Sequence, residues 1–96
     1  MKLLIEDRAA QAYRHLQPFE AKKVSQVIHA LESEHFEQFR MRRDIYKLST
    51  LGEQVFVLRA TPRIRMLVRY SEDHTLVIED IASHDALQRF LSGRYK

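Results

Sequence analysis

Residues Gln54–Ser71 read QVFVLRATPRIRMLVRYS, and this stretch decides the fold because it predicts two adjacent strands joined by a short turn. Side chains alternate between opposite faces along Gln54–Ala60 and again along Ile64–Tyr70, as they do in β-strands. Pro62 separates the two runs, since proline cannot donate the backbone hydrogen bond that a continuing strand needs. The stretch lacks acidic residues and carries four arginines: Arg59, Arg63, Arg65 and Arg69. It therefore predicts a basic β-hairpin.

The residues before the hairpin predict one strand and a pair of helices. Met1–Glu6 alternates weakly, and Asp7 can cap the helix that follows it. Pro18 ends this first helix and suits the first turn of a second helix, which we expect from Phe19 to about His35. Four apolar residues of the second helix have the spacing of a single helix face: Val24, Val27, Ile28 and Leu31. This pattern indicates an antiparallel helical hairpin whose apolar side covers a sheet.

The residues on either side of the hairpin complete the predicted sheet. One strand begins at Ile45, and another spans Thr75–Ala82. Ser83 is a good N-cap for a short final helix. Together these elements predict an α+β fold with a small antiparallel sheet of about four strands, an N-terminal two-helix hairpin packed on one face, and a short C-terminal helix. The other face of the sheet is then available for a ligand.

Length and composition limit the class of protein. A chain of 96 residues is too short to divide its apolar residues between two cores, so we expect a single domain over residues 1–96. The chain has no cysteine, which excludes disulfides and thiolate zinc sites. It has no signal-peptide pattern and no run approaching the roughly 20 apolar residues that span a bilayer. We therefore expect a soluble cytoplasmic protein that does not associate with membranes.

Basic residues gather in and just before the hairpin, where they could bind a polyanion. Arg43 and Lys47 precede it, and Arg63, Arg65 and Arg69 alternate with apolar residues within it. If the arginine-bearing face is open, several guanidinium groups converge there. Guanidinium groups match phosphate oxygens with forked donors and stay charged at physiological pH. The alternative is that these arginines only keep the face soluble and stop a strand edge from pairing with other chains.

His84 follows the last predicted strand and starts the final helix. An imidazole at this place can act as a general acid or base. Asp85 better suits a residue at the helix N-terminus, where it interacts with the helix dipole. The remaining histidines lack the spacing of metal ligands: His15, His29, His35 and His74. We therefore expect no metal site and no cofactor.

The order of these elements resembles the RelE/ParE superfamily of bacterial toxins. The segments that carry the resemblance are YKL, a strand ending in VLR, then RIRMLVRY and LVIEDIASHD, in the family's order and spacing from Ile45 to Asp85. The resemblance implies the toxin of a type II toxin–antitoxin system, in which a small antitoxin protein wraps the toxin in a hetero-oligomer. For the RelE branch it further implies a metal-independent endoribonuclease that cuts mRNA on the ribosome, with the RNA 2′-hydroxyl as the attacking group.

The resemblance also implies roles for single residues. Arg59 and Arg65 match the arginines that hold the scissile phosphate, and His84 falls where the branch places a basic or histidine residue that transfers a proton. Arg63, Arg69, Arg43 and Lys47 then supply supporting charge for RNA binding. The chain departs from the pattern at Phe90, where RelE-type enzymes often have a catalytic tyrosine.

This departure keeps two other classes of function open. ParE-type relatives share the fold, lack the ribonuclease residues and inhibit DNA gyrase through surface contacts. A toxin-like module with impaired catalysis, which only binds its partners, is the other alternative. The presence of Arg59, Arg65 and His84 together favours the nuclease over the gyrase inhibitor.

Overall fold

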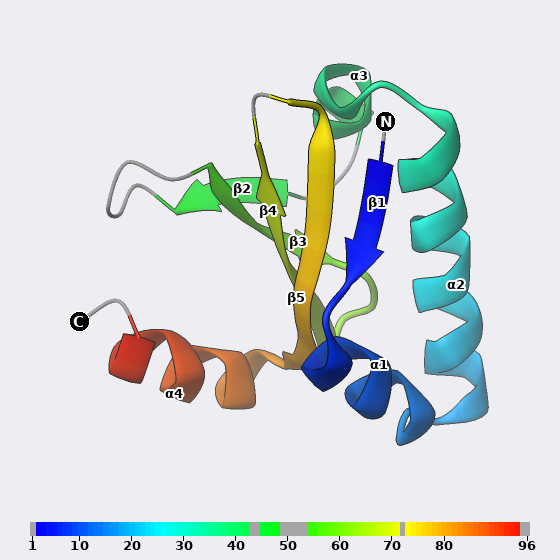
Figure 1. The fold of residues 1–96 in the computed structure, drawn as a ribbon. Coiled ribbons are helices and arrows are strands. Elements are labelled where there is room, and N and C mark those ends of the chain that lie inside the picture. Colours follow the sequence, from blue (N-terminus) through cyan, green and yellow to red (C-terminus); the bar gives the residue numbers. More distant parts are fainter. Residues whose placement is uncertain (1, 43–44, 49–53, 72, 95–96) are drawn as a thin grey trace.

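The computed structural model describes residues 2–42, 45–48, 54–71 and 73–94. Within these ranges, five strands form one sheet in the order β1-β5-β4-β3-β2, accompanied by four helices (Figure 1). The elements are β1 (Lys2–Ile5), α1 (Asp7–Arg14), α2 (Pro18–Ser33), α3 (Phe36–Arg42), β2 (Ile45–Leu48), β3 (Val55–Arg59), β4 (Ile64–Tyr70), β5 (Thr75–Ser83) and α4 (His84–Arg94). The α+β class, the two N-terminal helices and the short C-terminal helix are confirmed.

The sheet is mixed, whereas an antiparallel sheet of about four strands was predicted. β2, β3, β4 and β5 pair antiparallel in sequence, but β1 pairs parallel with β5, from Lys2 opposite Thr75 to Ile5 opposite Ile78. The alternation of side chains indicates that a segment is a strand. It does not indicate its neighbour, because a strand joined to the sheet through helices can run in either direction.

The larger core lies between the sheet and helices α1, α2 and α3. Apolar faces of α1 and α2 pack against the apolar side of β3, β4 and β5. Helix α3, which the sequence analysis did not predict, adds Phe36 to this core. The Phe36 ring stacks on Tyr70 with centroids 4.8 Å apart and meets Phe56 edge-on at 5.0 Å. This aromatic cluster fixes a seven-residue helix that is too short to be stable by itself.

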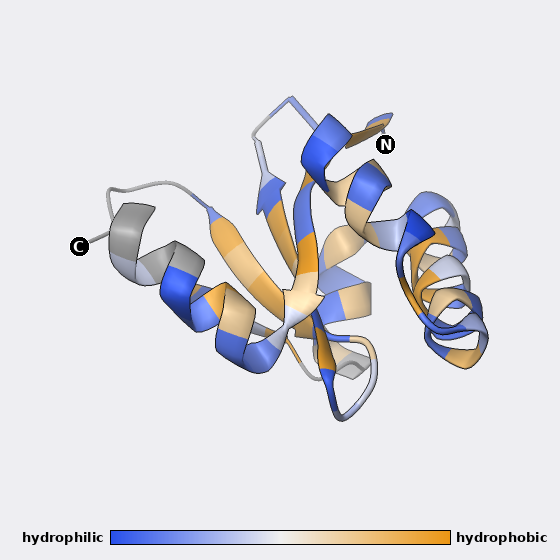
Figure 2. Cartoon of the chain, turned by 90° about the horizontal axis from the view of Figure 1, so that it is seen from below, coloured by the Kyte–Doolittle hydropathy of each residue, from blue (hydrophilic) through white to orange (hydrophobic). Residues whose placement is uncertain are grey.

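The opposite face of the sheet, which was expected to be available for a ligand, is partly covered by α4. Leu87 of α4 is buried in a second, smaller cluster with Val55, Val57 and Leu67. Figure 2 shows α4 and the α1–α2 pair on opposite sides of the strands. Where β3 ends and β4 begins, Arg59 is exposed and Arg65 is half-buried.

The helix starts follow their caps with one exception. Ser83 caps α4 as predicted, because its Oγ accepts a hydrogen bond from the Ala86 amide at 3.2 Å. Pro18 is the first residue of α2, also as predicted. Asp7 is not the N-cap of α1: Glu6 has that position, and Asp7 lies in the first turn, where its charge favours the helix dipole. In the described part of the chain, no helix combines the length and apolarity needed to cross a membrane.

Candidate functional site

Arg59 and Arg65 lie directly opposite each other in the ladder between β3 and β4. Directly opposite residues of an antiparallel pair share a face, with their Cβ atoms about 5 Å apart. Both arginines belong to the α4 side of the sheet, because their neighbours Leu58 and Met66 point into the larger core on the other side. Arg65 is in turn opposite Ala82 of β5. The structure thus brings the two predicted phosphate ligands into one row across the sheet.

The turn between β3 and β4 holds the guanidinium group of Arg65. Its Nη1 donates to the backbone carbonyls of Thr61 at 3.0 Å, Pro62 at 3.2 Å and Ile64 at 3.4 Å. The Thr61 hydroxyl braces the same turn by accepting the amides of Arg63 and Ile64, at 3.2 and 3.0 Å. Carbonyl oxygens orient the guanidinium group without neutralising it. The positive charge of Arg65 is therefore positioned and remains able to bind an anion.

His84 stands next to this row. It is the exposed first residue of α4, two positions after Ala82, and its backbone amide donates to the carbonyl of Arg63 at 3.1 Å. This hydrogen bond ties the start of α4 to the turn that carries Arg65. The ends of β3 and β5 and the start of β4 therefore bring Arg59, Arg65 and His84 to the same edge of the molecule.

Arg63 does not join the row, although it was predicted to share a face with Arg65. Its Nε and Nη2 donate to the two carboxylate oxygens of Glu20 in α2, both at 2.8 Å. Glu20 is only 1% exposed, and a buried carboxylate needs such a partner. The hydrogen bonds from Arg63 hold the pKa of the Glu20 carboxyl below its usual value, and Glu20 raises the pKa of Arg63. Arg63 is thus committed to an internal ion pair.

Two other predicted RNA-binding residues, Arg69 and Lys47, lie away from the row. Arg69 lies at the far end of β4, with its Nε 3.7 Å from the carboxylate of the buried Glu79. Lys47 is opposite Phe56 in the β2–β3 ladder and therefore belongs to the side of the sheet that α1, α2 and α3 cover. Arg43 lies outside the described residues. The structure does not gather Arg69 and Lys47 with Arg59 and Arg65.

Tyr46 is a candidate that the sequence analysis did not assign to the site. It is opposite Val57, so it shares a face with Arg59, its diagonal neighbour on β3, and it is 46% exposed. An exposed aromatic ring beside an arginine can stack on a nucleic-acid base. The alternation of Ile45 and Tyr46 indicated that the two side chains lie on opposite faces of the sheet. The register between β2 and β3 was needed to show which face carries Tyr46.

Phe90 lies within α4, as does His84. Tyr95, the one tyrosine that follows Phe90 in the sequence, lies outside the described residues. No cluster of three or more His, Asp or Glu residues suited to a metal ion occurs in the described part of the chain. Arg59, Arg65 and His84 supply two guanidinium groups suited to a phosphate and one imidazole suited to proton transfer.

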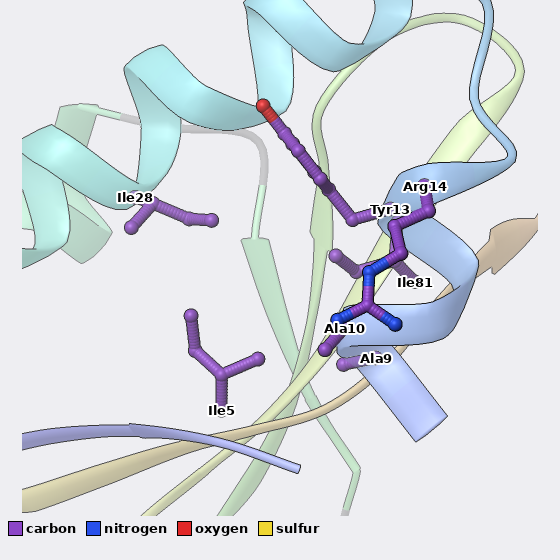
Figure 3. A pocket seen from close by; sticks show the side chains of 7 residues that line it. All are labelled: Ile5, Ala9, Ala10, Tyr13, Arg14, Ile28 and Ile81. Carbon is purple, nitrogen blue, oxygen red and sulfur yellow. The ribbon is translucent and has the colours of Figure 1, made fainter. Parts of the chain in front are cut away.

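A separate apolar pocket of about 340 Å³ lies between β1, α1 and α2 (Figure 3). Of its seven lining residues only Arg14 is charged: Ile5, Ala9, Ala10, Tyr13, Arg14, Ile28 and Ile81. Ile5 and its neighbour Leu4 are about half exposed, at 45% and 44%. Among the described residues, β1 pairs with β5 on one side and with no strand on the other. This edge is an exposed apolar surface next to unpaired backbone groups.

No protein-family model and no curated protein matches the sequence of this chain. Solved structures do match its fold. A chain of the archaeal RelE–RelB complex from Pyrococcus horikoshii OT3 superposes with a TM-score of 0.71 at 18% identity, over 85% of this chain and 92% of that one. A chain of the RelB–RelE antitoxin–toxin complex from Methanococcus jannaschii gives 0.72 at 12% identity, over 91% and 96%.

A third structure, the YoeB/ParE toxin from Agrobacterium tumefaciens, gives a TM-score of 0.63 at 16% identity, over 88% of this chain and 99% of that one. These matches span nearly the whole length of each solved chain, so they include the sheet and its helices together. Identities this low show a shared fold. The chain therefore has the fold of the RelE/ParE superfamily toxins.

Proposed function

We propose that this chain is the toxin of a type II toxin–antitoxin system and acts as a metal-independent endoribonuclease on ribosome-bound mRNA in the cytoplasm. The observation that carries the proposal is the row formed by Arg59 opposite Arg65, with His84 tied to the same turn. The fold shared with RelE-type toxins supports it.

In the proposed reaction, Arg59 and Arg65 hold the scissile phosphate and stabilise the charge that develops on its oxygens. The RNA 2′-oxygen attacks phosphorus and loses its proton, while the bond from phosphorus to the 5′-oxygen breaks. The leaving 5′-oxygen takes up a proton; His84 transfers one of these two protons, and water transfers the other. His84 is the residue that transfers a proton in this exchange, because an imidazole can both accept and donate near neutral pH. The products are a 2′,3′-cyclic phosphate and a 5′-hydroxyl end.

The proposed antitoxin covers the apolar pocket between β1, α1 and α2. Ile5 lines this pocket on an edge strand, so a partner segment can add to the sheet and place an apolar side chain against α1 and α2. Two of the solved relatives are complexes of RelE with RelB, which supports such a partner. The pocket and the arginine row lie on different surfaces, so the partner need not touch Arg65 to bind.

Induction of the chain without its antitoxin tests the function. We expect translation to stop, with mRNA cut within codons on ribosomes and with 5′-hydroxyl ends at the cuts. The Arg59→Ala/Arg65→Ala double variant is the control, and we expect it to leave transcripts intact. Growth arrest by the native chain with uncut transcripts would contradict the proposal.

Inhibition of DNA gyrase is the second candidate. Phe90 in place of a tyrosine favours it, as does the likeness to a toxin described as YoeB/ParE. Gyrase-dependent DNA breaks after induction, unaffected by the Arg59→Ala/Arg65→Ala substitutions, would select this function.

A further inference from the structure

Tyr46 is an exposed aromatic residue on β2, the strand at one edge of the sheet. We propose that the Tyr46 ring stacks on a base of the single-stranded RNA, next to the nucleotide whose phosphate lies at Arg65. The inference rests on the proposed ribonuclease function and adds an aromatic contact to its RNA site.

The strand register places Tyr46 and Arg65 on the same face of the sheet. Tyr46 lies opposite Val57, which belongs to the cluster that contains Leu87 of α4, and directly opposite residues share a face. Arg65 is on this side as well, because its neighbour Met66 belongs to the larger core on the other side. One ligand on the α4 side of the sheet can therefore meet both residues.

The distance between the two residues suits neighbouring nucleotides of one strand. β3 lies between β2 and β4, so two strand spacings of about 4.8 Å separate Tyr46 from β4. Val57 pairs with Tyr46 on one side and with Leu67 on the other, and Arg65 is two residues from Leu67 along β4. The two Cα atoms are therefore about 12 Å apart. Because both side chains are long, a phosphate at Arg65 and the base of an adjacent nucleotide at Tyr46 fit this span.

The Tyr46 side chain is exposed, although another residue on the same face of β2 is not. Leu48 lies two residues further along the strand and is half-buried against the cluster of Val55 and Val57, whereas Tyr46 is 46% exposed. The fully buried Val57 gives the Cβ atom of Tyr46 a rigid neighbour about 5 Å away. A tyrosine has only two side-chain torsions, so holding its ring against a base costs little conformational entropy.

The positive charge of Arg65 on the same face favours an RNA base over an apolar protein side chain as the occupant. Backbone carbonyls orient the Arg65 guanidinium group and leave it charged. A nucleotide strand brings a phosphate and a flat aromatic base together, and every base has a face that can stack on a tyrosine. The Tyr46 ring therefore positions the RNA without selecting its sequence.

Equilibrium binding of a single-stranded 2′-O-methyl oligonucleotide tests the inference, because this probe lacks the attacking hydroxyl and stays uncut. A second probe has the same backbone and length but no bases. The full-length chain is compared with Tyr46→Leu, which removes the ring, and with Tyr46→Phe, which keeps it. We expect Tyr46→Leu to weaken binding of the first probe about tenfold, in the range usual for one base–aromatic stack, and to leave binding of the second unchanged. We expect Tyr46→Phe to bind both probes as the native chain does.

Arg65→Ala is the control for a phosphate contact. We expect it to weaken binding of both probes and to reduce the slope of log K against log salt by about 0.7, the effect of one phosphate contact on a single strand. We expect Tyr46→Leu to leave this slope unchanged, because the ring carries no charge.

Fluorescence gives a second measurement, since the chain has no tryptophan and Tyr46→Trp introduces a single indole. We expect the base-bearing probe to quench this indole and the probe without bases to leave it unchanged. Leu4→Trp is the matched control, because Leu4 is exposed on β1, at the opposite edge of the sheet. Equal quenching in the two variants would contradict a stack at Tyr46.

Native affinity of Tyr46→Leu for the base-bearing probe would overturn the inference and leave the exposed ring as a surface for a protein partner. If Arg65→Ala still weakens binding in that case, the proposed function stands. Equal losses on the two probes in Tyr46→Leu would also overturn the inference, since the ring would then act through the fold and not through a base. A native chain that binds neither probe would overturn the proposed function together with the inference.

Discussion

Arg63 and Arg65 lie two residues apart at the same turn, yet their guanidinium groups have different partners. Arg63 is bound to the carboxylate of Glu20, with two contacts of 2.8 Å, whereas Arg65 donates to three neutral carbonyls. A carboxylate neutralises the charge of an arginine, whereas a carbonyl orients the guanidinium group without neutralising it. The position of an arginine in a basic stretch therefore does not decide whether it can bind phosphate. What decides it is whether the group that already contacts the arginine is charged or neutral.

The largest expected effect comes from removing the arginine whose charge is still available. We expect Arg65→Ala to lower the rate of mRNA cleavage by about 10²–10³-fold, the usual cost of losing one group that stabilises transition-state charge. Its loss of hydrogen bonds to the turn should cost about 1.5–3 kcal/mol of unfolding free energy, the usual net contribution of a hydrogen bond to a charged group. Single-turnover cleavage assays and urea unfolding measure the two quantities.

Lys47→Ala is the control for Arg65→Ala. Lys47 is exposed on the side of the sheet that α1, α2 and α3 cover, so the variant removes one positive charge without touching the arginine row. We expect cleavage to change little. If both variants lose activity equally, net charge rather than the placement of Arg65 would explain the loss.

A smaller effect on cleavage, with a larger one on stability, is expected for Arg63→Ala. The substitution leaves Glu20 buried without its partner, and unpaired buried charges are strongly destabilising. We expect the melting temperature to fall by several degrees, while cleavage well below that temperature falls much less than in Arg65→Ala. Thermal melts with cleavage assays on the same samples make the comparison.

The double variant Glu20→Gln/Arg63→Gln separates the charge of the pair from its shape. It replaces both charges with amides, of the same size as the carboxylate at Glu20 and shorter than the guanidinium group at Arg63, and we expect it to recover most of the melting temperature lost in Arg63→Ala. An Arg63→Ala protein that melts normally and is as inactive as Arg65→Ala would show that Arg63 binds RNA after all.

The sequence predicts the strands of this sheet better than it predicts the helices that pack on them. The expected strand Ile64–Tyr70 has the same bounds as β4, because alternation of apolar residues is a local signal. Helix α3 was missed because its stability comes from contacts of Phe36 with Phe56 and Tyr70, which are distant in the sequence. Likewise, the sequence around Leu87 did not indicate that α4 would cover part of the presumed open face.

The part of the site that is formed by two strands adjacent in the sequence could be predicted. A hairpin with a short turn places Arg59 opposite Arg65, so that pairing could be inferred from Pro62 and the two flanking runs. The commitment of Arg63 to Glu20 could not, since the two residues are far apart in the sequence and only the packing of α2 brings them together.

The smallest predicted effect is a dependence of stability on pH that tests the Glu20–Arg63 pair itself. The pKa of the Glu20 carboxyl is lowered in the folded protein, chiefly by its hydrogen bonds with Arg63. A carboxyl of this kind stabilises the fold above its unfolded pKa, about 4.3 for glutamate, and this contribution is lost as the pH falls through the lower folded pKa. The destabilisation by Glu20→Gln should therefore be full at neutral pH and shrink in acid.

Urea unfolding of the native chain and of Glu20→Gln at a series of pH values measures this difference, with Glu32→Gln as the control for an exposed carboxylate of α2. We expect the Glu32→Gln chain to stay close to the native chain at every pH. A Glu20→Gln difference that is constant from neutral to acid pH would mean that Glu20 contributes by its volume and not by its charge. Arg63 would then keep its own charge for a ligand, and the contrast with Arg65 would disappear.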